Sequence, residues 1–178
     1  FQNGVPVAIN REKMGPTQLV LKMNQLAGAN GVGRIDIMED RMMGLKVREN
    51  YECPGATVFL KAHRALENLV LTRAAIRFKA IIDQEWSRLA YEGLWWDPLK
   101  DDLESFISHT QKRVSGQVKL KLYKGNLTVL GRKSEWALYS EDLASFDTTT
   151  FDQCESTGSV KNFGLQARMY QQLLNKRV

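Results

Sequence analysis

Cysteine and histidine are scarce in this 178-residue chain, and their spacing excludes several kinds of site. The two cysteines, Cys53 and Cys154, lie far apart and outside any C-x-x-C pattern, and the two histidines are His63 and His109. Because a zinc site needs several suitably spaced cysteine, histidine or carboxylate ligands, we expect no metal site. We expect two free thiols in a reducing cytoplasm, with a disulfide as the less favoured alternative.

Long apolar runs and phosphate-binding loops are also missing. No apolar segment approaches the roughly 20 residues of a membrane span, and the opening FQNGVPVAIN has no signal-peptide regions. Neither a G-x-x-x-x-G-K-[ST] loop nor a G-x-S-x-G elbow occurs, and the glycine-rich segment 28–34 follows a predicted helix, which it ends. We therefore expect no membrane partner, no bound cofactor and no catalytic residue here. The strand-like opening indicates a piece of a longer protein.

The spacing of apolar residues predicts an α+β fold. Helix-start signals occur at Thr17, just past Pro54, at Thr72 and at Asp97, which precedes Pro98. Strands are expected over residues 4–9, 33–39 and 42–48, with an antiparallel hairpin over 117–133. The expected architecture is helices packed with a mixed or antiparallel sheet and this hairpin. Residues 140–160 are expected to be irregular, before a protruding C-terminal helix over GLQARMYQQLLNKR.

The helix after Pro54 contains His63 among apolar residues, which is typical of a packed or hydrogen-bonded structural histidine. A formal net charge of +5 permits an anionic partner. The 117–133 hairpin combines lysines with Tyr123, so a nucleic-acid-binding domain is an alternative function. Lysines on the exposed side of an amphipathic strand explain the same pattern, and we favour that explanation.

The segment RIDIMEDRMMGLKVRENYECPG, residues 34–55, carries many charges of both signs around Gly44. Pairing of its two strands could bring the Glu39 carboxylate beside the Tyr51 phenol. Such a pair suits a small polar ligand with ammonium or amide donors. A solvated charged strand pair is the alternative, and the residues alone leave both open. Three cations of the segment, Arg34, Lys46 and Arg48, are expected to form ion pairs with Asp36, Asp40 and Glu49.

The segment GVGRIDIMEDRMMGLKVRENYECPG resembles the G-V-G-R-x-D-x-x-E-[ND]-R-x-x-G-x-K-x-R-x-x-Y-E-x-P-G pattern of argininosuccinate synthases. Further segments follow that family's order: AHRALE, YEGLWWDP, KGNLTVLGRKS, LYSEDLASFD, FDQCESTG and NFGLQARMY. The resemblance covers nearly the whole chain. It departs at Asp40, where Asn is frequent, at Cys53, where Thr is frequent, and at TGSVKN.

The resemblance implies a C-terminal synthetase domain over residues 1–160 and an oligomerisation helix over 161–178. The family is a cytoplasmic ligase of arginine biosynthesis and the urea cycle, which joins citrulline to aspartate with release of AMP. The resemblance places ATP with Mg²⁺ mainly on an upstream nucleotide-binding domain, and aspartate there as well. It aligns Glu39 and Tyr51 with citrulline contacts, and it implies a homotetramer.

Overall fold

The protein is described here by a computed structural model, which covers residues 1–144 and 152–176 and divides the chain into two units, 1–138 and 139–178. The first unit contains β1 (Ala8–Ile9), β2 (Glu12–Lys13), α1 (Pro16–Ala29), β3 (Arg34–Asp40), β4 (Lys46–Glu52), α2 (Pro54–Val70), α3 (Arg73–Tyr91), α4 (Pro98–Gln111), β5 (Gln117–Tyr123) and β6 (Asn126–Lys133). These strands form antiparallel pairs, β1–β2, β3–β4 and β5–β6. The α+β prediction is confirmed, with separate antiparallel pairs in place of a mixed sheet.

Two helices begin at capping side chains that were predicted from the sequence. The Thr72 hydroxyl accepts a hydrogen bond from the Ala75 N–H at 3.3 Å, and Asp97 accepts one from the Leu99 N–H at 2.9 Å. Pro98 occupies the first helical position, where its missing N–H costs nothing. The cap expected at Thr17 is wrong, because Pro16 already begins α1.

The expected strand over residues 4–9 is shorter than predicted. Only Ala8–Ile9 pairs as a strand, and Gln2 forms an isolated bridge with Val5. Pro6 has no N–H to donate to a ladder, and Asn3 and Gly4 adopt positive φ angles. The chain therefore turns here instead of extending.

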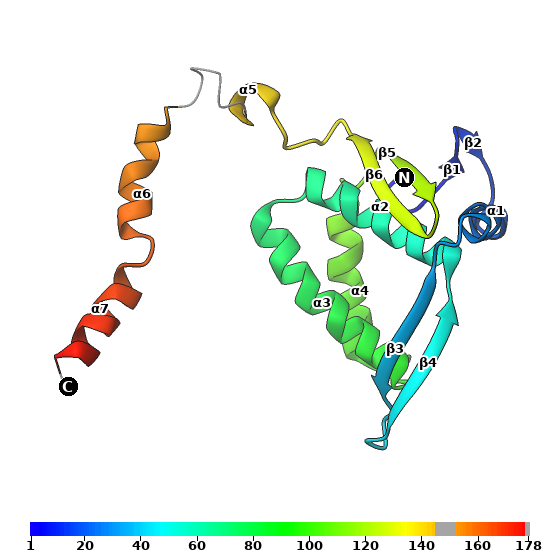
Figure 1. The fold of residues 1–178 in the computed structure, drawn as a ribbon, viewed down its shortest axis with the longest axis horizontal. Coiled ribbons are helices and arrows are strands. Elements are labelled where there is room, and N and C mark those ends of the chain that lie inside the picture. The colour runs from blue at the N-terminus through cyan, green and yellow to red at the C-terminus, as the bar shows by residue number, and fades with distance from the viewer. Residues whose placement is uncertain (145–151, 177–178) are drawn as a thin grey trace. The chain divides into compact units, whose positions relative to one another are not determined.

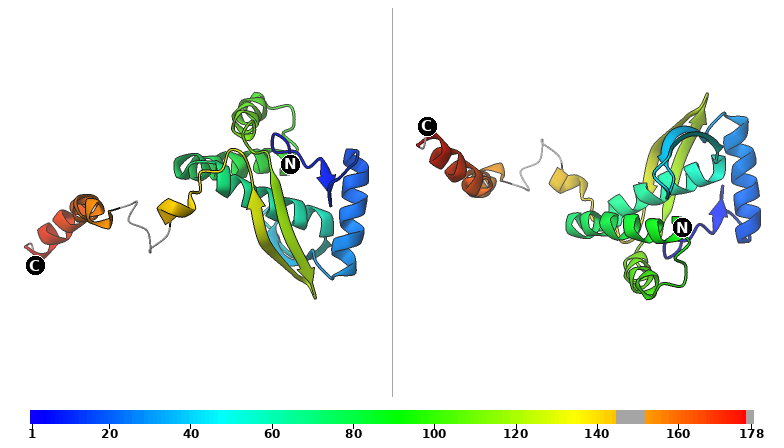
Figure 2. Two further views of the ribbon diagram at one scale, coloured as in Figure 1. Left: turned by 90° about the horizontal axis from the view of Figure 1, so that it is seen from above. Right: turned by 90° about the horizontal axis from the view of Figure 1, so that it is seen from below.

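Helix α2 lies at the centre of the first unit. Figure 2 shows the β5–β6 hairpin crossing α2, with α1 packed against one end of the same helix. One buried cluster joins the end of α2 to the segment before β5, and comprises Leu66, Val70, Leu71 and Val114. The other lies under the hairpin, and comprises Ala27, Val32 and Val58 with half-buried Leu120, Leu122 and Leu127. The opposite face of β5 presents exposed Lys119 and Lys121, so its predicted alternation is confirmed.

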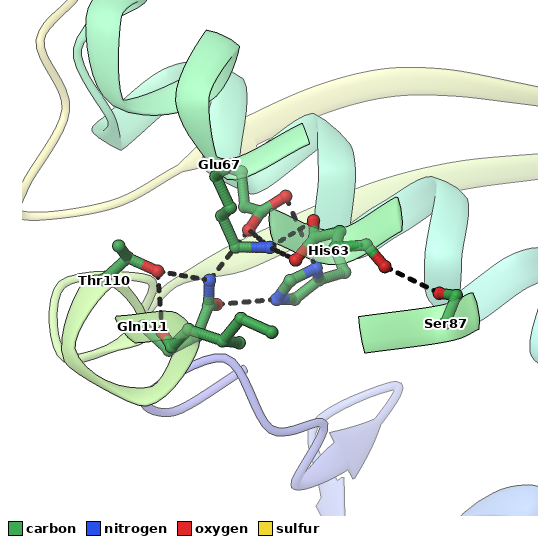
Figure 3. A network of polar contacts seen from close by, with 8 residues as sticks. His63, Glu67, Ser87, Thr110 and Gln111 are labelled. Atoms are coloured by element: carbon green, nitrogen blue, oxygen red, sulfur yellow. Dashed lines mark hydrogen bonds and ion pairs between the residues drawn. The ribbon is translucent and has the colours of Figure 1, made fainter. Parts of the chain in front are cut away.

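A polar network joins α2, α3 and α4 beside these clusters (Figure 3). Lys79 Nζ lies 3.1 Å from Glu67 Oε1 and donates to Asp83 Oδ2 at 2.6 Å. Gln111 Nε2 donates to the same Glu67 oxygen at 2.8 Å, while Gln111 Oε1 lies 2.8 Å from Nε2 of His63. The interpretation of His63 as a hydrogen-bonded structural residue is confirmed. The network lines a cleft of about 630 Å³, and its polar groups bond mainly to one another.

The second unit contains α5 (Glu141–Ala144), η1 (Gln153–Glu155), α6 (Ser156–Asn162) and α7 (Leu165–Asn175). The irregular conformation expected over 140–160 is wrong at both ends of that range, where α5 and α6 form, and residues 145–151 lie outside the described residues. The sequence STGSVKN of α6 is poor in strong helix formers, which explains the error. The final helix is confirmed and exposes the apolar residues Leu165, Met169, Leu173 and Leu174. Of the helices in the described parts of the chain, none combines the length and apolarity needed to cross a bilayer.

Candidate ligand-binding site on the β3–β4 hairpin

The β3–β4 hairpin extends from the start of α2 towards the far end of α3 (Figure 1). Its second strand begins at Lys46 and not at residue 42, because residues 41–45 form the turn. The Arg41 N–H donates to the Leu45 carbonyl at 2.8 Å, and the Gly44 N–H donates to the Arg41 carbonyl at 2.8 Å. Gly44 has a φ of +79°, which glycine adopts without strain. The turn chemistry therefore fixes the strand register.

The other end of the hairpin is fixed by Gly33. The Cys53 N–H donates to the Gly33 carbonyl at 2.8 Å, which closes the ladder just before α2. Gly33 has a φ of +97°, and a Cβ there would lie 2.3 Å from Cα of Pro54. A side chain at this position would therefore push the hairpin away from α2.

One face of the hairpin carries cross-strand ion pairs exposed to solvent. Arg34 lies 3.6 Å from Glu52, Lys46 lies 2.7 Å from Asp40, and Arg48 lies 2.5 Å from Asp36. Lys46 and Arg48 therefore pair with two carboxylates of the expected set, Asp40 and Asp36. The third expected carboxylate, Glu49, is wrong, because Glu49 pairs with Arg41 and Arg34 pairs with Glu52. Exposed pairs of this kind add at most about 1 kcal/mol each.

The opposite face brings Glu39 and Tyr51 together. The Tyr51 hydroxyl donates a hydrogen bond to Glu39 Oε2 at 3.1 Å. The Glu39 side chain is 18% exposed, and Tyr51 as a residue is 41% exposed. The hydrogen bond from Tyr51 to Glu39 is the main reason why the pKa of the Tyr51 phenol lies above its ordinary value. Proximity of these two groups, expected from the sequence, is thus found in the structure.

Two further residues complete this face, and the sequence reasoning missed the role of both. Arg41 Nη1 lies 3.2 Å from Glu39 Oε1, and Arg41 Nη2 donates to Oε1 of Glu49. The Tyr91 hydroxyl, at the end of α3, donates to the Asp40 carbonyl at 3.3 Å. The two-residue spacing from Glu39 could have placed Arg41 on this face. The contact of Tyr91 joins residues far apart in the chain and has no local sequence signal.

The charges on this face leave an excess of one negative charge. Glu39 and Glu49 are acidic, Arg41 is the cation between them, and the Tyr51 hydroxyl can donate or accept. An ammonium or amide group is therefore a suitable ligand for the face. Across residues 1–144 and 152–176, no group of three or more His, Cys, Asp or Glu side chains is arranged to hold a metal ion.

Comparison with known proteins decides the family. The family model of the arginosuccinate synthase C-terminal domain matches residues 1–170. The chain belongs to this family. As an arginosuccinate synthase C-terminal domain it includes the whole β3–β4 hairpin within the matched range, together with Glu39 and Tyr51.

Curated relatives of this C-terminal domain are named argininosuccinate synthase. The chain is 58% identical to the Methanocaldococcus jannaschii protein over 171 residues, which are 96% of the chain and 43% of that relative. It is 58% identical to the Methanosarcina mazei protein over 176 residues, 99% of the chain and 45% of the relative. The Archaeoglobus fulgidus protein is 52% identical over 173 residues, 97% of the chain and 44% of the relative. The chain thus spans less than half the length of these relatives.

The 117–133 hairpin of this C-terminal domain gains no support as a nucleic-acid site from the family or from these relatives. The inner face of the hairpin packs on α1 and α2. On its outer face, Nζ of Lys121 and Lys124 lie 5.5 and 5.3 Å from the centre of the Tyr123 ring. The exposed lysines are therefore sufficiently explained by an amphipathic strand.

Proposed function

We propose that this chain is the C-terminal part of an ATP-dependent ligase of arginine biosynthesis, which condenses citrulline with aspartate to form argininosuccinate. AMP and pyrophosphate are the other products. The observation that carries the proposal is the family match over residues 1–170, together with relatives at 58% identity that bear the name argininosuccinate synthase. The chain supplies part of the citrulline site and a subunit interface, and we expect it to be inactive alone.

Glu39 and Tyr51 are the proposed citrulline contacts. The Glu39 carboxylate accepts hydrogen bonds from the amino-acid end of citrulline, and the Tyr51 hydroxyl, 3.1 Å from that carboxylate, orients the same end. Both act as positioning groups that hold the ureido oxygen where it can react. Their contribution is entropic and electrostatic, and neither transfers a proton. The proposal is supported by the shared face and by its excess negative charge.

The remaining substrates are assigned to an upstream nucleotide-binding domain. The chain has no glycine-rich phosphate loop, and its described residues hold no group suited to a metal ion. These residues do not fit ATP with Mg²⁺, so we place ATP, Mg²⁺ and aspartate mainly on the upstream domain. The adenylation of citrulline is the chemistry that ATP supplies there.

Assembly into a homotetramer is also part of the proposal. Helix α7 exposes an apolar stripe, and the hairpin turn exposes Met42, Met43 and Leu45. Uncovered apolar side chains of this kind mark contact surfaces in larger assemblies. We assign residues 1–160 to the synthetase domain, residues 161–178 to subunit contacts, and the assembled enzyme to the cytoplasm.

A chimera tests the proposed function. This chain replaces the matching 45% of the Methanosarcina mazei relative, and AMP release is measured with and without citrulline and aspartate. We expect release that requires both amino acids, and none from the chain alone. A folded chimera that lacks this activity, while the chain binds single-stranded nucleic acid in a salt-dependent manner, would favour the nucleic-acid alternative.

A further inference from the structure

Arg41 occupies the space between the two carboxylates on the Glu39 face of the hairpin. Its Nη1 lies 3.2 Å from Glu39 Oε1, and its Nη2 donates a hydrogen bond to Glu49. Because Glu39 and Glu49 come from different strands, the guanidinium bridges β3 and β4. The cations of the other face, by contrast, each pair with one carboxylate exposed to solvent.

The two oxygens of Glu39 have different surroundings. Oε2 accepts the hydrogen bond from Tyr51. Oε1 is buried and accepts no hydrogen bond, although the Arg41 guanidinium is close enough to form an ion pair with it. A donor that approaches this carboxylate from solvent cannot reach Oε1. It therefore meets the Oε2 side, where the Tyr51 hydroxyl also lies.

The backbone of Arg41 is itself held in place. Its N–H and carbonyl both form hydrogen bonds within the turn, to Leu45 and Gly44. The Tyr91 hydroxyl from α3 bonds to the carbonyl of the preceding residue, Asp40, at 3.3 Å. The backbone that carries the Arg41 side chain is therefore held in place by both the turn and α3.

We propose that Arg41 is a positioning residue that holds the Glu39 carboxylate in place, covers its Oε1 and presents its Oε2, with the Tyr51 hydroxyl, to the ammonium group of the substrate. This inference rests on the proposed function, because it assigns a role within the same citrulline site. The other ionisable groups around Glu39 and Arg41 are Tyr51 and Glu49 from β4 and Tyr91 from α3, which interacts with Arg41.

The electrostatic reason lies in the closeness of the two carboxylates to one cation. Without the guanidinium, Glu39 and Glu49 would repel each other, and the two side chains would tend to move apart. The Glu39 carboxylate would no longer be held by the bridge, and its Oε2 would no longer be fixed beside the Tyr51 hydroxyl. Both changes would weaken binding of citrulline without affecting aspartate or ATP.

The test uses the full-length chimera and compares Arg41→Met, Arg41→Lys and, on the opposite face, Arg48→Met. We expect Arg41→Met to raise the citrulline KM about threefold to tenfold and to leave the KM values of aspartate and ATP within about twofold. Arg41→Lys keeps the charge between the two carboxylates and should bring the citrulline KM back to within about threefold of the unchanged chimera. Arg48→Met should leave all three KM values within about twofold of the unchanged chimera.

Glu49→Gln keeps Arg41 and removes only its second partner, so it provides an independent variant if Arg41→Met does not fold. We expect it to raise the citrulline KM about two- to fivefold. The inference is overturned if Arg41→Lys raises the citrulline KM as much as Arg41→Met does, or if neither Arg41→Met nor Glu49→Gln changes the citrulline KM. Glu39→Gln is measured in parallel. If it raises the citrulline KM while these variants do not, only the role of Arg41 fails. If it has no effect, the proposed citrulline contact fails.

Discussion

The Tyr51 hydroxyl reaches the Glu39 carboxylate across the hairpin although these two residues are not opposite each other in the strand register. Glu39 lies opposite Val47, and Tyr51 lies opposite Ile35. The two side chains project from the same face and are long enough to reach each other. Their hydrogen bond therefore depends on the register that the turn at Gly44 sets.

We expect Glu39→Gln to raise the citrulline KM of the full-length chimera about tenfold or more. The substitution keeps the shape of the side chain and removes its charge, and a hydrogen bond to a charged group contributes roughly 1.5 to 3 kcal/mol. Steady-state kinetics with each substrate varied in turn measures the change. Glu52→Gln, on the other face of the hairpin and paired with Arg34, is the matched control. Equal KM values for the two variants would refute a role for Glu39 in binding.

The pKa of the Tyr51 phenol provides a test that needs no substrate. Its hydrogen bond to Glu39 raises this pKa above the ordinary value of 10.0. The associated stabilisation is therefore complete below pH 10 and is lost as the pH rises through the higher pKa of the folded state. Alkaline difference spectra of the chain against Tyr51→Phe measure the pKa. We expect Glu39→Gln to lower it and Glu52→Gln to leave it unchanged.

We expect Lys79→Met to destabilise the first unit by about 3 kcal/mol or more. The Lys79 side chain is 7% exposed and neutralises Glu67, which is 12% exposed, so the substitution leaves a carboxylate inside without its cation. Urea unfolding measures the loss. Lys119→Met, on the exposed face of β5, should change stability by less than about 0.5 kcal/mol. Similar unfolding midpoints for the two variants would contradict this account of the network.

The two threonines at helix starts should respond differently to alanine. Thr72 caps α3, so Thr72→Ala should cost about 1 kcal/mol. Thr17 lies within α1 and is exposed, so Thr17→Ala should be neutral or slightly stabilising, because alanine has the higher helix propensity. Thermal or urea unfolding of both variants measures the difference. A cost for Thr17→Ala as large as that for Thr72→Ala would show that the helix start has been assigned to the wrong residue.

The parts of the fold that sequence could predict are those with local chemical causes. Thr72 and Asp97 cap their helices through bonds to residues two or three positions away, and the alternation of β5 appears directly in its residues. The network around Lys79 could not be predicted, because Glu67 and Gln111 meet it only after three helices have packed. Distant contacts of this kind have no periodic signal.

The same distinction applies to the candidate site. Glu39 and Tyr51 could be placed on one hairpin, since Gly44 marks the turn between them. The position of β4 was predicted less well, because the sequence did not show that the turn uses residues 41–45. The extent of the turn determines which cation lies beside Glu39. Arg41 takes this place, while Arg34 pairs with Glu52.

The backbone of Arg41 forms hydrogen bonds within the turn, and its guanidinium contacts the carboxylates. A one-residue insertion or deletion at Met42 or Met43 would change the hairpin register, and a register shift of one residue turns side chains to the other face of a strand. The length of the turn therefore determines which charged side chains lie on each face of the hairpin. A change of loop length that is harmless in most surface loops would here move side chains from one face to the other.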